Sequence, residues 1–159
     1  MQIKIIAVGK CREKYYADAV REYLKRLSRF ASVQIVEIAD EPAPDALSNA
    51  QLIQIKQAEG KRILARIGAE ERVVALCIGG KRYDSVQWAQ HWQQKMNQGS
   101  GRWCFIIGGS NGLSDDVLRR ADEQLSFSDF TFCHQLMRVI LLEQIYRAMK
   151  ILRGESYHK

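Results

Sequence analysis

The sequence RWCFIIGGSNGLS spans residues 102–114 and contains, in order, an apolar run, a glycine-rich segment and a serine. Continuous apolar runs are typical of strands covered on both faces. Glycine permits tight turns and close approach of a ligand to the backbone, and serine caps helix N-termini. The stretch therefore predicts a buried strand over 102–107, a glycine turn and a short helix after Ser114.

Strand and helix patterns alternate on both sides of this stretch. Apolar runs predict further strands at 2–8, 33–39 and 72–78. Apolar residues at helical spacing predict four more helices, which we place at 16–30, 48–67, 85–96 and 135–153. Such alternation is typical of a mostly parallel sheet with helices on both faces, so we expect one α/β domain over residues 1–159.

Composition and cysteine spacing exclude several classes of protein. With 159 residues, 47% of them hydrophobic, one core can form without a disulfide or metal. No apolar run approaches the ~20 residues of a membrane span, so we expect a cytoplasmic protein. The four cysteines form no CxxC pair and the three histidines have no ligand spacing, which argues against a metal. Cys77 and Cys104 lie in apolar runs and are interpreted as buried hydrophobes.

The net charge of +6 is concentrated in two regions. Residues 61–100 carry seven basic and three acidic side chains, and residues 134–159 carry five basic and two acidic ones. A basic cluster is either a solvated helix face or an anion-binding surface. Charge alone leaves both interpretations open.

Glycines follow the two most buried strands, where open α/β sheets bind ligands. Residues 78–80 (IGG) and 106–114 (IIGGSNGLS) are either cofactor loops or tight strand-to-helix turns. Neither matches a P-loop or the GxGxxG fingerprint, which argues against kinase-like and ordinary dinucleotide-binding folds.

Residues 125–132 (LSFSDFTF) alternate small polar side chains with phenylalanines, and we expect them to form short extended pieces. Together they offer an apolar slot and hydrogen-bonding groups suited to an adenosine, although packing in the core would explain the phenylalanines equally. His134 and Arg138 follow on one face of the last helix. Tyr157 and His158 lie in a polar tail after Gly154.

The order of IKIIAVGK, FIIGGSNGLS, LSFSDFTF, HQLMRVILLEQIYRA and RGESYHK along the chain closely resembles SPOUT-class RNA methyltransferases. The resemblance is to those that modify N3 of a pseudouridine in 23S ribosomal RNA. It implies a C-terminal trefoil knot, a homodimer and S-adenosylmethionine as cofactor. A trefoil knot is a rare exception to the rule that chains do not thread loops.

The resemblance also implies which residues bind the cofactor. The predicted set is Leu76, Gly108, Phe127, Ser128, Asp129, Phe130, Thr131 and Phe132. Cys133 departs from the family pattern, which usually has a proline before this histidine.

Methylation of the weakly acidic N3–H requires loss of a proton, which suggests roles for three further residues. His158 is our candidate base, Arg138 the candidate cation near the carbonyl oxygens of the nucleobase, and Tyr157 the residue that positions or stacks on the base. His134 is expected to orient the start of the helix, and His91 has no predicted role.

A chain of this size has little surface for choosing one nucleotide. We therefore expect a homodimer acting on 23S rRNA within the assembled large subunit or 70S ribosome, with affinity chiefly from phosphate contacts. Two alternatives remain: a non-catalytic ribosome-binding module, and a small α/β enzyme that uses another nucleotide.

Overall fold

A computed structural model describes residues 1–157 of the chain. Five parallel strands form a sheet in the order β2-β1-β4-β3-β5. Their bounds are β1 Gln2–Val8, β2 Ser32–Ile38, β3 Arg72–Lys81, β4 Arg102–Ile107 and β5 Glu123–Leu125. The sheet confirms the predicted parallel α/β fold, and β1 and β4 have the predicted bounds.

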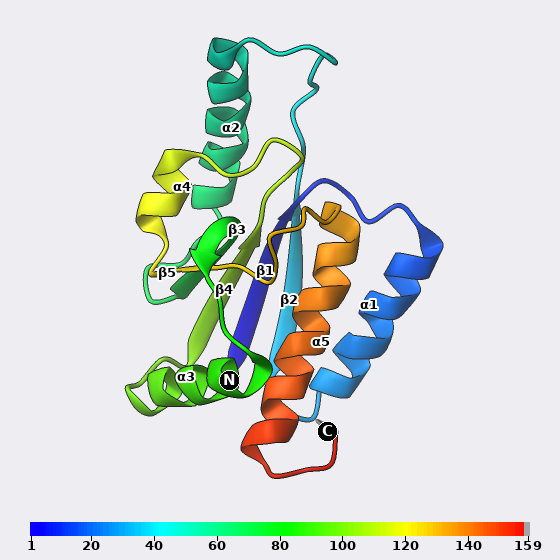
Figure 1. Cartoon of the computed structure of the whole chain (residues 1–159), viewed down its shortest axis with the longest axis vertical. Helices are drawn as coiled ribbons and strands as arrows, with labels where there is room; N and C mark the ends of the chain where they lie inside the picture. Colours follow the sequence, from blue (N-terminus) through cyan, green and yellow to red (C-terminus); the bar gives the residue numbers. More distant parts are fainter. Residues whose placement is uncertain (158–159) are drawn as a thin grey trace.

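Helices cover both faces of this sheet (Figure 1). On one face pack α1 Lys14–Leu27, α3 Ser85–Asn97 and α5 His134–Leu152; on the other pack α2 Asn49–Leu64 and α4 Asp115–Arg120. The predicted helices are therefore present, with ends that differ by a few residues.

The central strands are buried on both sides, which explains their continuous apolar runs. Successive side chains of a strand point to opposite faces. In β1, Ile3 and Ile5 join the core beneath α1, α3 and α5, whereas Ile6 and Val8 join the core on the α2 and α4 face. The strands β1 and β4 are thus held from both layers.

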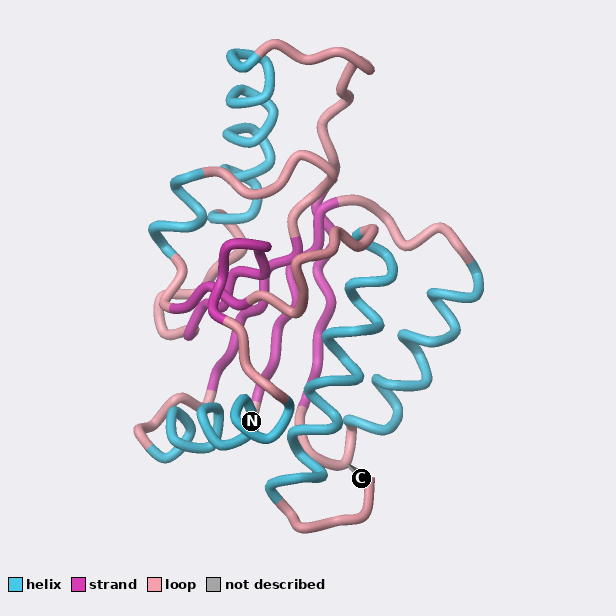
Figure 2. The backbone as a smooth tube through the Cα atoms, viewed as in Figure 1, coloured by secondary structure: helices cyan, strands magenta, loops and turns pink. Residues whose placement is uncertain are grey.

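The end of β3 curls around the chain at Leu125, and we call residues 76–81 the β3 curl (Figure 2). Leu125 pairs with Leu76 and also with Lys81 of the same strand. At Gly80 the approach is so close that a Cβ would lie 2.6 Å from the carbonyl carbon of Leu125. Glycine is required there because any side chain would overlap the backbone of β5.

The structure corrects three details of the predicted elements. Residues 78–80 belong to β3 and are not a turn, because Lys81 still pairs with Leu125. Residues 126–133 form a loop without extended pieces, and the only strand nearby is the preceding β5. The cap of α3 is Asp84, one residue before Ser85, since its carboxylate accepts from the backbone N–H of Gln87 at 2.7 Å.

The two apolar-run cysteines differ in burial. Cys104 is fully buried as predicted, and burial raises its pKa to about 12. Cys77 is only half-buried, because it belongs to the β3 curl at the sheet edge. Among residues 1–157, no cluster of His, Cys, Asp and Glu is arranged to hold a metal ion, and no helix is long and apolar enough to cross a bilayer.

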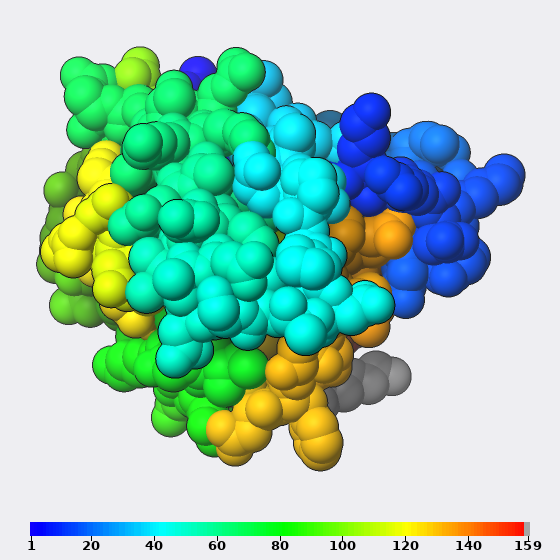
Figure 3. Space-filling model, turned by 90° about the horizontal axis from the view of Figure 1, so that it is seen from above, coloured from blue at the N-terminus to red at the C-terminus, as the bar shows by residue number. Residues whose placement is uncertain are grey.

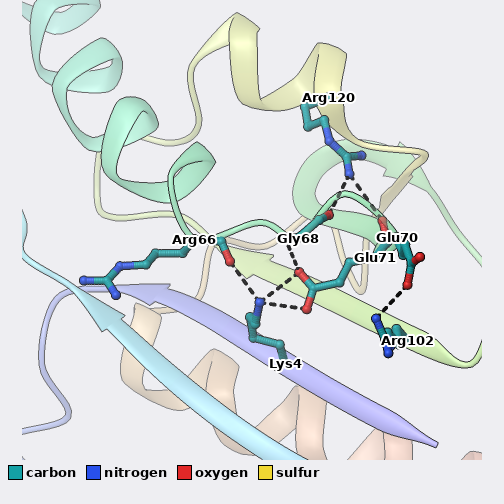
Figure 4. Close-up of polar contacts among 7 residues, drawn as sticks. All are labelled: Lys4, Arg66, Gly68, Glu70, Glu71, Arg102 and Arg120. Atoms are coloured by element: carbon teal, nitrogen blue, oxygen red, sulfur yellow. Dashed lines mark hydrogen bonds and ion pairs between the residues drawn. The ribbon is translucent and has the colours of Figure 1, made fainter.

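Opposite the ligand-binding edge, charged groups close the amino ends of β3 and β4 (Figure 4). This amino-end network comprises Lys4, Arg66, Gly68, Glu70, Glu71, Arg102 and Arg120. At its centre Glu71 pairs with Lys4 Nζ at 2.7 Å and accepts from the backbone N–H of Gly68 at 2.6 Å. Lys4 also donates to the carbonyl of Arg66 at 2.9 Å. The side chains of Lys4, Glu70, Glu71, Arg102 and Arg120 thus each have a partner within the fold, whereas Arg66 takes part through its backbone carbonyl.

Candidate functional site

A cavity of about 680 Å³ lies at the carboxyl ends of β3 and β4. Three segments form its walls: the start of the β3 curl, the loop after β4, and the chain from β5 to the start of α5. Its lining residues are Leu76–Ile78, Ile107–Leu113, Leu125–Ser128, Phe130–His134 and Met137. The cavity therefore forms where parallel sheets present ligand sites, as the sequence predicted.

The loop after β4, residues 108–113, is called the glycine loop below. It turns back on itself between Gly109 and Gly112, where the Gly112 N–H donates to the Gly109 carbonyl at 3.1 Å. Gly112 has φ +81°, a conformation that L side chains rarely adopt. Ser114 then caps α4 as predicted, accepting from the Val117 N–H. The turn places bare backbone along the cavity wall.

The loop between β5 and α5 combines local hydrogen bonds with phenylalanines. The Ser126 hydroxyl donates to the Ser128 carbonyl, and the Ser128 hydroxyl accepts from the Phe130 N–H, each at 3.0 Å. Phe127 packs edge-on against Trp88 with ring centroids 6.2 Å apart, whereas Phe130 is 79% exposed. Phe127 thus packs in the core as one interpretation predicted, while Phe130 is exposed and its binding of an adenosine stays a prediction.

A comparison with protein-family models matches residues 1–158 to the family described as "Predicted SPOUT methyltransferase". The match covers nearly the whole chain, including every segment that lines the cavity. The chain belongs to the SPOUT methyltransferase family. SPOUT methyltransferases generally use S-adenosylmethionine, so the cavity is next tested against that cofactor.

The cavity of this SPOUT protein suits S-adenosylmethionine in size and charge. Small-molecule pockets usually measure roughly 300–1,000 Å³, and this volume lies in that range. Apolar walls from Leu76, Ile107 and Phe132 suit an adenine ring, and the glycine loop offers backbone donors and acceptors. No Lys, Arg, Asp or Glu lines it, so no cation of the wall opposes a sulfonium.

His134 closes the cavity at the first residue of α5. Its ring lies against Gly9, where a Cβ would approach the Cε1 atom to 2.9 Å. Its Nδ1 lies 3.4 Å from Arg138 Nη2. Burial, reinforced by the Arg138 charge, lowers the pKa of His134 below its usual value. The imidazole is therefore neutral at pH 7 with Nδ1 as the acceptor, because a guanidinium can only donate.

Arg138 is buried behind His134 and does not line the cavity. Its guanidinium is 1% exposed, pairs with Glu37 at 2.5 Å and donates to the Gly9 carbonyl at 2.6 Å. These contacts tie α5 to the ends of β1 and β2. The predicted role of Arg138 as a cation facing the nucleobase stays a prediction; the contacts described here position His134.

Seven of the eight predicted cofactor residues line the cavity. They are Leu76, Gly108, Phe127, Ser128, Phe130, Thr131 and Phe132. Asp129 does not, because its carboxylate is exposed and pairs with Arg82 Nη1 at 2.8 Å. Which of these residues touch a cofactor stays a prediction.

Tyr157, the described residue of the predicted catalytic pair, lies away from the cavity of its own chain. The Tyr157 ring packs on Tyr146 at 4.9 Å between centroids, and its hydroxyl donates to Glu143 at 3.2 Å. Tyr146 follows His134 by twelve residues, which places the two about 18 Å apart along the helix axis. His158 lies outside the described residues. One described chain therefore does not bring Tyr157 to the cavity.

The sequence analysis missed part of the lining. The additional residues include Ile78, Ser110, Asn111, Leu113, Cys133 and Met137. Ser110 and Asn111 stand inside the glycine segment that the analysis had marked, so extending the prediction along GGSNG would have found them. Ile78 likewise belongs to the marked segment 78–80, whereas Met137 gave no signal, because it lies in the apolar pattern of α5.

Proposed function

We propose that this SPOUT protein is an S-adenosylmethionine-dependent methyltransferase that acts on N3 of a pseudouridine in 23S rRNA. We further propose that it works as a homodimer on the assembled large subunit or 70S ribosome. The observation that carries the proposal is the uncharged, glycine-walled cavity at the carboxyl edge. The substrate assignment rests on the resemblance of the sequence motifs, whose tail RGESYHK follows α5.

The residues around the cavity suit methyl transfer by alignment. When bound, the cofactor supplies an electrophilic methyl group on a positively charged sulfur. His134 is neutral and the described lining carries no charge, so no anion of the wall would neutralise the positive sulfur. The sulfur would therefore remain part of a good leaving group. Holding the methyl group in line with N3 alone contributes up to about 7–11 kcal/mol. In such a transfer the N3–C bond would form as the C–S bond broke, with the electron pair left on sulfur, while the residues of the cavity would hold the methyl group in line.

Proton removal falls to the tail in this proposal. His158 accepts the N3 proton, and Tyr157 positions the base. Such a base accelerates reactions by about 100- to 10,000-fold. Tyr157 lies beside Tyr146 and away from the cavity of its own chain, which supports a tail supplied by a second copy. The homodimer is therefore part of the proposed mechanism, and not only a source of surface.

Cations beside the cavity support RNA as the substrate. Many basic residues of the two predicted regions are neutralised within the fold, for example Arg72 by Glu123 and Lys150 by Glu155. In contrast, Lys10 and Arg12 after β1 are exposed and form no ion pair within residues 1–157. Gln135 at the start of α5 holds the Arg12 backbone N–H at 2.8 Å, and Figure 3 shows this dark-blue segment beside the orange start of α5. Phosphates approaching the cavity would meet these charges.

The β3 curl supports a threaded C-terminal region. Leu125 pairs with both Leu76 and Lys81, so the chain leading to α5 passes beside both ends of the β3 curl. We propose that this passage is part of the trefoil knot that the resemblance implies.

Two measurements test the function. Calorimetric titration should show S-adenosylmethionine binding to the protein, and mass spectrometry of rRNA from cells lacking it should show one pseudouridine without its methyl group. No binding heat together with unchanged rRNA would favour a non-catalytic ribosome-binding module. Binding of a different nucleotide in a thermal-shift panel would favour another small enzyme.

Mixed dimers test the contribution of the second copy. We expect Gly108→Val, which fills the cavity wall, and His158→Ala each to be inactive as pure dimers. Mixing them should restore roughly a quarter of wild-type activity, because half the dimers contain one intact composite site. Mixtures that stay inactive, with heterodimers present by native mass spectrometry, would place tail and cavity in the same chain.

A further inference from the structure

Glu59 is a buried carboxyl group on α2 that has no place in the proposed chemistry. Its residue is 3% exposed. One oxygen, Oε1, accepts from the backbone N–H of Glu41 at 3.0 Å, whereas Oε2 has no hydrogen-bond partner. Buried polar groups in native folds are nearly always satisfied, so an unpartnered oxygen requires an explanation.

The unpartnered oxygen faces the glycine loop. A Cβ placed on Gly109 would lie 3.3 Å from Glu59 Oε2, so the carboxyl group lies directly against the backbone of that loop. The next residue, Gly60, is in equally close contact with Ser114, where a Cβ would come within 2.3 Å of the hydroxyl. Glu59 and Gly60 of α2 therefore pack against Gly109 and Ser114, near the two ends of the glycine loop.

The surroundings favour an uncharged carboxyl group. Burial is the main cause that raises the pKa of Glu59. The hydrogen bond from the Glu41 N–H lowers this pKa, and the nearby carboxylates of Asp40 and Glu41, in the loop after β2, raise it. Arg62 on the same helix opposes them, but it is engaged by Glu41 and by the Ala39 carbonyl. Residues 108–114 contribute no charged side chain. A neutral acid also carries a proton on one oxygen, and thus offers the loop a donor.

We propose that Glu59 is a positioning residue of the cofactor site, which as a neutral acid holds the glycine loop and on losing its proton releases it. The inference rests on the proposed function at one point: S-adenosylmethionine is named as the ligand. Its affinity should fall when the glycine loop is released. Ionisation would place an unpaired charge beneath Gly109, and the loop would have to open to let water reach it.

The test compares Glu59→Gln with the wild type between pH 5 and pH 9. Glutamine has the shape of the neutral acid, accepts from Glu41 and donates where Oε2 lies, but does not ionise. We expect cofactor affinity of the wild type to fall relative to Glu59→Gln as pH rises, because the folded protein then has to hold an ionised Glu59. Glu59→Ala should weaken binding about tenfold at every pH, since it removes the acceptor of the Glu41 N–H and the packing of the carboxyl group against Gly109. His134 titrates alike in both proteins and drops out of the comparison.

Hydrogen exchange of residues 108–114 without cofactor gives a second readout that does not depend on the proposed function. Faster exchange of this peptide in the wild type than in Glu59→Gln at high pH is the expected result, after correction for intrinsic rates. Glu70→Gln, an exposed acid in the amino-end network, serves as the matched control and should leave both readouts unchanged. Parallel pH profiles for wild type and Glu59→Gln in exchange would overturn the inference, whether or not the cofactor binds.

Discussion

The two edges of the sheet satisfy their polar groups in opposite ways. At the amino edge, Glu71 and Lys4 meet each other and nearby backbone atoms, so the charges are used up within the fold. At the carboxyl edge, glycines and phenylalanines surround a cavity, and the charged Arg138 is kept behind the wall. The comparison shows that the charges of Glu71 and Lys4 at one edge are paired within the fold, while the described lining of the cavity at the other edge is uncharged.

The two edges should also differ in how much stability a substitution costs. Ion pairs can be exchanged for other side chains at modest cost. Backbone packed on backbone leaves no such freedom, because any added atom overlaps a neighbour. The predictions below test this contrast, starting with the largest expected effect.

Gly80→Ala should cause the largest loss of stability, because its Cβ would lie 2.6 Å from the Leu125 backbone. We expect a decrease of about 3 kcal/mol in the free energy of unfolding, measured by urea denaturation. Gly79→Ala is the control, since a Cβ there meets nothing within 4 Å. Equal effects of the two substitutions would show that the β3 curl is looser than described.

Arg138→Gln should destabilise the fold by about 2 kcal/mol, because the Gly9 carbonyl loses its donor and Glu37 its partner. It should also raise the pKa of His134, since a neighbouring positive charge disfavours protonation of the imidazole. Nuclear magnetic resonance titration of the ring measures this shift. Arg12→Gln, which removes a weaker influence on the same ring, should produce a smaller rise.

Glu71→Gln tests the amino edge. Losing the charge opposite Lys4 should cost about 1 kcal/mol of stability while leaving cofactor affinity unchanged. Glu70→Gln, which breaks only the exposed pair with Arg102, should cost less than about 0.5 kcal/mol. Urea denaturation and calorimetry on the same samples separate the two readouts. A loss of cofactor affinity in Glu71→Gln would mean that the edges are coupled.

Asp129→Asn should have the smallest effect on stability, within about 0.5 kcal/mol, because its pair with Arg82 is exposed. Arg82→Ala should behave alike in urea denaturation. Calorimetry with the cofactor then tests the predicted binding role of Asp129. If Asp129 contacts the cofactor, Asp129→Asn should bind it more weakly than the wild type, and Arg82→Ala should bind it as the wild type does. Equal affinities in the two variants would mean that Asp129 forms only a surface ion pair and does not bind the cofactor.

The sequence predicted the layers of this fold well, because burial leaves a direct mark on composition. The continuous apolar runs at 72–78 and 102–107 identified two buried strands, whereas the alternation at 2–8 predicted a strand without predicting that both of its faces are covered. Ser114 predicted the start of α4, because serine caps helix N-termini. The role of Gly80 could not be predicted, because a glycine that permits a turn and one that permits close packing look the same in a sequence.

The candidate site was predictable to the extent that its residues are neighbours in sequence. The run from Phe127 to Phe132 lines one wall almost continuously, so marking the segment sufficed. Glu59 and His134 owe their positions to contacts with Gly109 and Gly9, which are distant in sequence. Only the parallel pairing of strands brings these partners together.

The pairing of β1 with β4 also constrains how the chain is made. Gln2 lies beside Arg102, so β1 leaves the ribosome about 100 residues before the strand that becomes its second neighbour, β4. At about 5–20 residues per second, this interval lasts roughly 5–20 s. During it, one edge of β1 with its buried isoleucines stays open to other chains. The centre of the finished sheet is therefore its most vulnerable part during synthesis.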